Sequence, residues 1–144
     1  MPWRHFAVVV PSRLVLARVL QSLVETRTPL QGFADHLGSE AIYLTDPDGN
    51  GIELYRDRPR QEWQYAPDGS LRMATDPLDM EGLCAELDGQ PDGWPGLHSQ
   101  TRLGHMHLHV ASIAEAEAFY HDILGFDLVL RYGPTASFFS AGGY

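Results

Sequence analysis

A strand followed by a helix and further strands is predicted twice along this sequence, and the repetition restricts the possible folds. In the first unit, residues 5–10 (HFAVVV) predict a short buried strand, and Ser12 is a suitable N-cap for a helix that extends to about Glu25. Residues 41–45 and 52–55 flank the turn DPDGNG, and together they predict a β-hairpin.

The second unit begins with residues 103–110 (LGHMHLHV), which alternate in the manner of a strand. Ser112 and Glu115 then form an S-x-x-E capping box, and Gly125 is the expected stop of the helix that follows. Two more strands are predicted after the helix, at residues 126–132 and 136–141.

Two units of one type can pair their sheets into a half-barrel that encloses a site, so we expect a single α+β domain. We place the first module at residues 1–58 and the second at 103–144, with a linker at 59–102 that is rich in Pro, Gly, Asp and Gln. The linker contains one predicted short helix, at about residues 77–87. We expect the second module to be one strand short, so either its last strand is missing or another chain supplies that edge.

Composition excludes several classes of protein. A formal net charge of −9 and a pI near 5.0 argue against a surface that tracks the phosphates of nucleic acid. The one cysteine, Cys84, forms neither an internal disulfide nor a cysteine-based zinc site. No apolar run reaches the roughly 18–20 residues of a membrane span. We therefore expect a cytoplasmic protein.

Strand alternation brings three metal-binding side chains to comparable positions. His5 should point away from the helix of its module, and His105 should do the same in the second module together with His107 and His109. Glu53 shares a polar face of the hairpin with Tyr55. Two imidazoles and a carboxylate on a rigid sheet suit Fe(II), and Mn(II) or Zn(II) would also fit. The alternative is that the histidines and Glu53 are solvent-facing residues of edge strands.

Three segments resemble one known superfamily. They are residues 35–55 (DHLGSEAIYLTDPDGNGIELY), the run LGHMHLHV with the later AEAFYHDILGF, and the opening RHFAVVVPS. They are similar to the vicinal oxygen chelate superfamily (glyoxalase, bleomycin resistance protein, dioxygenase), and within it to the catechol 2,3-dioxygenase-like type I extradiol dioxygenases. This resemblance implies a fold of paired βαβββ modules.

The resemblance also implies a site and a reaction. The family's metal ligands match His5, Glu53 and His105. A further histidine and a tyrosine, which in the family lie near the metal and take part in catalysis without binding it, match His36 and Tyr43. A catechol would chelate Fe(II) through both oxygens, O2 would bind beside it, and the ring would open next to the diol. Further predicted substrate-binding residues are His107, His109 and Tyr55.

Other functions fit the same residues. A glyoxalase-like isomerase would keep the metal and need no oxygen. A truncated or inactive module pair would act as a small-ligand binding or resistance-type protein. The module order matches the second and third modules of a four-module protein, so the chain is either a fragment or a protein that completes its site within one chain or across a homodimer, by strand or module exchange.

Overall fold

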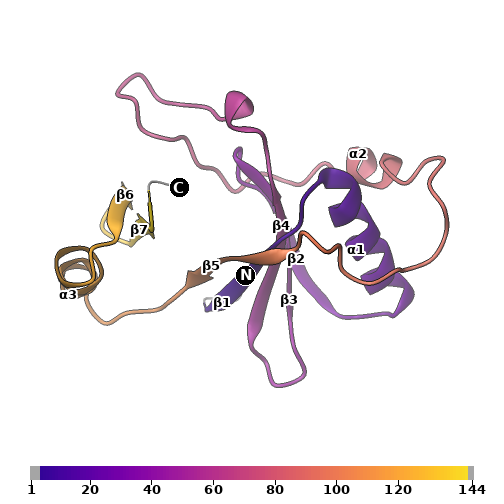
Figure 1. Ribbon diagram of the computed structural model, residues 1–144, viewed down its shortest axis with the longest axis horizontal. Coiled ribbons are helices and arrows are strands. Elements are labelled where there is room, and N and C mark those ends of the chain that lie inside the picture. Colours follow the sequence, from indigo (N-terminus) through magenta and orange to yellow (C-terminus); the bar gives the residue numbers. More distant parts are fainter. Residues whose placement is uncertain (1–3, 143–144) are drawn as a thin grey trace.

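The structure is a computed structural model that describes residues 4–142, and its first module is complete (Figure 1). The module consists of β1 (His5–Val9), α1 (Arg13–Glu25), β2 (Leu30–Asp35), β3 (Ser39–Thr45) and β4 (Gly51–Asp57). Helix α1 begins where predicted, because the Ser12 side chain accepts a hydrogen bond from the backbone N–H of Val15.

The strands of the first module form one sheet in the order β2-β3-β4-β1. Strand β1 runs parallel to β4, whereas β2–β3 and β3–β4 are antiparallel. Strand β2 was not predicted from the local pattern, because only Ala34 in it is buried and the backbone register shifts between Leu30 and Gly32. A bulged edge strand lacks the regular alternation that identifies strands in sequence.

The segment between the modules contains a short 3₁₀ helix, η1 (Arg60–Glu62), and helix α2 (Met80–Ala85). Helix α2 is shorter than the predicted range, and Asp79 caps it by accepting from the N–H of Gly82. Leu78 and Leu83 from this segment are buried in the same core as α1. The segment therefore packs against the first module.

The second module contributes one strand to the main sheet. Strand β5 (Arg102–His107) pairs antiparallel with β1 and extends the order to β2-β3-β4-β1-β5. Helix α3 (Ile113–Glu117) follows, with Ser112 as its N-cap, and continues as a π-helical turn, η2 (Ala118–Ile123). Gly125 ends this helical segment in the left-handed region, with φ +82°.

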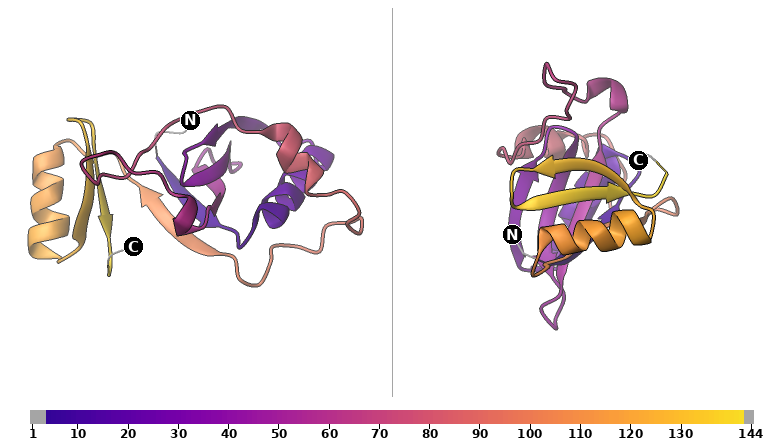
Figure 2. Two further views of the ribbon diagram at one scale, coloured as in Figure 1. Left: turned by 90° about the horizontal axis from the view of Figure 1, so that it is seen from above. Right: turned by 90° about the vertical axis from the view of Figure 1, so that its left-hand side faces the viewer.

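Strands β6 (Asp127–Tyr132) and β7 (Ala136–Ser140) form a separate two-stranded sheet. With α3 they lie on the side of the main sheet opposite α1 (Figures 1 and 2). In the sheet of the first module, β4 lies between β1 and β3 and pairs with both. Residues 4–142 contain no equivalent strand that would pair with both β5 and β7. The α+β class and the paired modules are confirmed, and in the described part of the chain β5 is the strand of the second module that joins the main sheet.

The main sheet has two distinct faces. One face packs against α1 through a cluster that includes Val10, Leu16, Leu20, Ile42 and Leu54. The opposite face carries a second cluster, whose members are Ala7, Val9, Ala34, Ala41, Tyr43 and Tyr55. Across residues 4–142, every helix is too short or too polar to cross a bilayer. The site described below lies on the second face.

Candidate metal centre

A single row of side chains crosses four strands on the face opposite α1. Tyr43 on β3 pairs with Glu53 on β4, Glu53 pairs with Ala7 on β1, and Ala7 pairs with His105 on β5. Side chains at paired positions of neighbouring strands share a face. The Ala7 side chain is only a methyl group, and it is completely buried. Glu53 and His105 can therefore meet above it.

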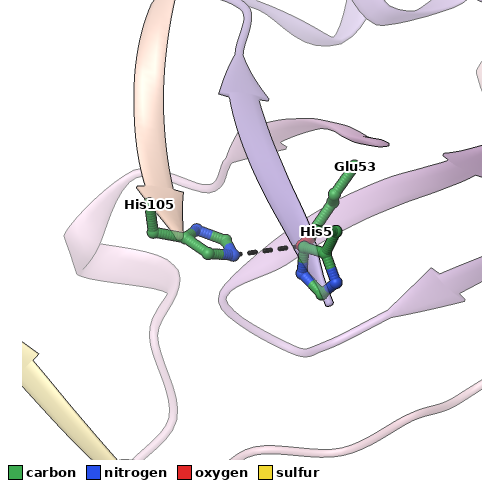
Figure 3. Close-up of side chains that lie close together, drawn as sticks. All are labelled: His5, Glu53 and His105. Carbon is green, nitrogen blue, oxygen red and sulfur yellow. Dashed lines mark hydrogen bonds and ion pairs between the residues drawn. The ribbon is translucent and has the colours of Figure 1, made fainter. Parts of the chain in front are cut away.

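His5 completes a cluster with these two residues (Figure 3). It lies two positions before Ala7 on β1 and therefore on the same face. Its Nε2 is 2.9 Å from Glu53 Oε2, and the Nε2 atom of His105 is 3.1 Å from the same oxygen. Gly51 pairs with His5 on the β4 side and adds no side chain beside the imidazole.

The carboxylate is the most enclosed part of the cluster. The side chains of His5 and Glu53 are 6% and 5% exposed, whereas that of His105 is 46% exposed. Burial alone would raise the pKa of Glu53, but hydrogen bonds from His105 and His5 outweigh it and lower this pKa to about 2. Glu53 is therefore ionised at neutral pH and held by both imidazoles.

The three ligand atoms fit a small divalent cation. All lie within 4.8 Å of one another. An ion at about 2.0–2.2 Å from each of them places adjacent ligand atoms roughly 3 Å apart, as for the two separations from Glu53. The three donors would be two imidazole nitrogens and one carboxylate oxygen. The residues present therefore fit a 2-His-1-carboxylate site.

Tyr43 and His36 form a hydrogen-bonded pair beside this cluster. His36 Nε2 lies 2.7 Å from the Tyr43 hydroxyl, and His36 Nδ1 lies 2.7 Å from the backbone oxygen of Ala74. A carbonyl oxygen only accepts hydrogen bonds, so Nδ1 carries a proton and donates it to Ala74. The segment between the modules thus fixes the orientation of the His36 ring.

Tyr43 is buried and stays protonated. Burial, and then the nearby negative charge of Glu53, raise the pKa of the Tyr43 hydroxyl well above its ordinary value. The ring of Tyr43 lies 5.8 Å from that of His5 in an edge-to-face arrangement. Tyr43 therefore presents a neutral hydroxyl next to the ligand cluster.

The other predicted site residues lie around the cluster. The His107 ring is 4.9 Å from that of His5, and burial followed by the neighbouring imidazoles lowers the pKa of His107. His109 lies just beyond β5, is exposed, and has its ring 6.2 Å from that of His107. The Tyr55 ring is 5.2 Å from that of His105, although Tyr55 itself is buried. Substrate contact by these three residues stays a prediction.

Two features of the site were missed in the sequence. The β1–β5 register shifts between Ala7 and Val8, so that Gly104 is an extra residue in β5, directly before His105. A glycine inside an alternating strand is the sequence signal for such a bulge. No sequence pattern indicated the hydrogen bond from His36 to Ala74, because its acceptor is a backbone oxygen in an irregular segment.

Comparisons with known proteins identify the family of the chain. Residues 102–144 match the family model of the Glyoxalase/Bleomycin resistance protein/Dioxygenase superfamily. The chain is 48% identical over 141 residues to catechol-2,3-dioxygenase of Bacillus subtilis (strain 168), a match that covers 97% of this chain and 48% of that protein. The chain thus spans about half the length of this curated relative. No solved structure matches the chain significantly.

Proposed function

Because the chain belongs to the glyoxalase/bleomycin resistance/dioxygenase superfamily, we propose that it binds one divalent metal ion and cleaves a catechol-type ring with O2, next to the diol. The observation that supports this proposal most directly is the convergence of His5, Glu53 and His105, from three strands and both modules, on one point. The relative named catechol-2,3-dioxygenase supports the choice of an aromatic diol as substrate.

The three proposed ligands would contribute one negative charge and two neutral nitrogen donors to the metal. Glu53 carries one negative charge. Because its side chain is buried, where the effective dielectric constant is low, its electrostatic attraction for a cation is stronger than at the surface. To bind the same ion, His5 and His105 would carry their ring protons on Nδ1 and offer unprotonated Nε2 atoms in place of the hydrogen bonds to Glu53. An ion such as Fe(II), when bound, would supply oxygen activation and a template for the two diol oxygens. Mn(II) or Zn(II) would be held by the same atoms.

Tyr43 and His36 would take part in proton transfer to and from the diol. The neutral hydroxyl of Tyr43 lies beside Glu53 and can hydrogen-bond to an oxygen of a bound substrate. His36 Nε2 lies 2.7 Å behind that hydroxyl and can take up or return a proton through it. The protonated Nδ1 stays on the Ala74 oxygen, which leaves Nε2 as the nitrogen that faces the reaction.

We also propose that two copies of the chain associate. The support is the second module, where large apolar side chains remain exposed, among them Met106 at 63% and Ile123 at 72%. Light scattering over a range of concentrations tests this proposal, and a mass of about 16 kDa at every concentration would contradict it.

Reconstitution with metal tests the ring-cleavage proposal. Protein loaded anaerobically with Fe(II) should bind one ion per completed site, and then consume O2 and form a yellow product with catechol. Glu53→Gln should abolish both metal binding and O2 uptake, while Glu25→Gln at the exposed end of α1 should change neither. Metal binding with isomerase activity and no O2 uptake would instead support a glyoxalase-like function. Wild-type protein that binds no divalent ion contradicts the proposal.

A further inference from the structure

The position of His105 depends on how β5 attaches to the first module. All six residues of β5 are exposed, and within residues 4–142 its one neighbour in the sheet is β1. The two other proposed ligands belong to the first module. Whether the three ligands meet is therefore decided by the contacts that fix β5 against β1 and β4.

One such contact joins Gly104 to Tyr55. A Cβ atom built on Gly104 would lie 2.8 Å from both Cε1 and Cζ of the Tyr55 ring, and closer still to its hydroxyl oxygen. These separations are shorter than any ordinary carbon–carbon contact. The backbone of β5 therefore rests directly on the Tyr55 ring, and only a residue without a side chain permits that approach.

The Tyr55 ring cannot move aside easily. Tyr55 is 7% exposed and belongs to the buried cluster on this face, where it pairs with Val9 on β1 and Ala41 on β3. Its ring is rigid and enclosed, so a side chain at position 104 would displace the β5 backbone. The residue directly after that position is His105.

We propose that Gly104 and Tyr55 are positioning residues, whose close contact at the β5 bulge sets the location of His105 relative to His5 and Glu53. The proposal rests on the proposed metal site and assigns these two residues an indirect part in it. Because of the bulge, the Cβ position of Gly104 faces Tyr55, on the same face of the sheet as the proposed site. The contact therefore lies directly beside His105. Metal ligands tolerate errors of only about 0.2 Å, less than the shift that an added methyl group would demand.

Gly104→Ala tests the contact, with Gly32→Ala as the matched control. Gly32 also lies beside a register shift in a strand, and a Cβ atom there would meet nothing within 4 Å. We expect Gly104→Ala to raise the dissociation constant for Co(II), measured by calorimetry, about 10- to 100-fold, as for changes to residues that orient metal ligands. Gly32→Ala should leave that constant unchanged. Equal effects of both variants would overturn the proposal.

Hydrogen exchange of the metal-free protein gives a second measurement that does not depend on metal binding. In Gly104→Ala, the β5 amides that bond to β1 should exchange at least about tenfold faster, with β3 and β4 unaffected. Unchanged protection of β5 would contradict the proposal even if the wild-type protein bound no metal. If the proposed metal site is wrong but the contact is right, the wild-type protein would bind no Co(II), and Gly104→Ala would still speed the exchange of the β5 amides.

A double variant separates the proposed contact from general disruption. Tyr55→Leu removes the ring that a side chain at position 104 would meet. Adding Gly104→Ala to Tyr55→Leu should therefore cost little further protection of β5, whereas it costs much in the wild-type background. If Gly104→Ala alone does not fold, recovery of the circular dichroism spectrum in the double variant supports the proposal. Additive losses, or no recovery, would overturn it.

Discussion

Small residues lie between the proposed ligands on the sheet. Ala7 has neighbours on both sides, Glu53 on β4 and His105 on β5, whose side chains meet at 3.1 Å above its buried methyl group. Gly51 adds no side chain beside His5, and Gly104 allows the β5 backbone to approach the Tyr55 ring next to His105. The arrangement needs both the donors and the space between them.

A larger side chain at position 7 should separate the ligands. Ala7→Val adds two methyl groups where Glu53 and His105 approach each other, and overpacking of this kind costs about 1–3 kcal/mol of stability. We expect the Co(II) affinity to fall at least about tenfold as well. Ala34→Val, in the same buried cluster on β2, should lower stability without changing metal affinity. Titration calorimetry and urea unfolding distinguish the two effects.

Tyr43 and His36 should act as one unit in turnover. In the Fe(II)-loaded protein, Tyr43→Phe removes the hydroxyl 2.7 Å from His36 Nε2 and should lower the rate of ring cleavage about 100-fold. His36→Gln should cause a loss of similar size, and the double variant should lose little more than either one. The rates are measured as O2 uptake at saturating catechol. If the loss in the double variant equals the product of the two single losses, the two residues act independently.

The convergence of the three proposed ligands was predictable in part, because alternation in β1, β4 and β5 decides which side chains share a face. His5, Glu53 and His105 were placed on equivalent faces in this way, and the family resemblance selected them from seven histidines and many carboxylates. Gly104 was missed, because strict alternation was assumed through a strand that contains a bulge. Register between strands far apart in sequence depends on such irregularities, which local patterns rarely reveal.

At the scale of elements, the helices were easier to predict than the edges of the sheet. Ser12 and Ser112 each accept a backbone hydrogen bond at the start of a helix, as their sequences indicated. Strand β2 was not found, and the contacts at its end involve charges that come together only in the folded chain. There Arg58 donates two hydrogen bonds to Asp35, at 2.7 and 2.8 Å.

The Asp35–Arg58 pair predicts how stability depends on pH. Hydrogen bonds from Arg58 outweigh partial burial and lower the pKa of Asp35 below its ordinary value of 3.8. A lowered pKa stabilises the folded state above pH 3.8, and this stabilisation is lost as the pH falls through the folded-state value. Asp35→Asn should therefore cost about 1–3 kcal/mol at pH 7, and the difference from wild type should shrink below pH 3.8.

Urea unfolding at several pH values measures this dependence. Asp92→Asn, in the exposed loop before β5, serves as the control and should follow the wild-type curve throughout. A difference between Asp35→Asn and wild type that stayed constant down to pH 2 would contradict the assignment of the effect to this ion pair.

At the scale of the whole molecule, part of the segment between the modules packs into the core of the first module. Composition favoured a linker there, since Pro, Gly and Asp are typical of loops. In the structure, Leu78 and Leu83 of this segment are buried in the core cluster shared with α1, and the oxygen of Ala74 contacts His36 beside the site. A few apolar side chains decide whether such a segment packs, and their contacts lie far away in sequence.

Leu83 gives the clearest test of that packing, because its side chain is completely buried within the core cluster shared with α1. Leu83→Ala should lower the free energy of unfolding by about 2–5 kcal/mol, since it removes buried methyl groups and leaves a cavity. Leu97→Ala, at a position 55% exposed in the same segment, should cost less than about 0.5 kcal/mol. If the segment were a passive tether, both variants would unfold at the same urea concentration as wild type. Because α2 lies on the α1 side of the sheet, Leu83→Ala should also leave the Co(II) affinity of the folded protein unchanged, so that stability and metal binding respond to different parts of the chain.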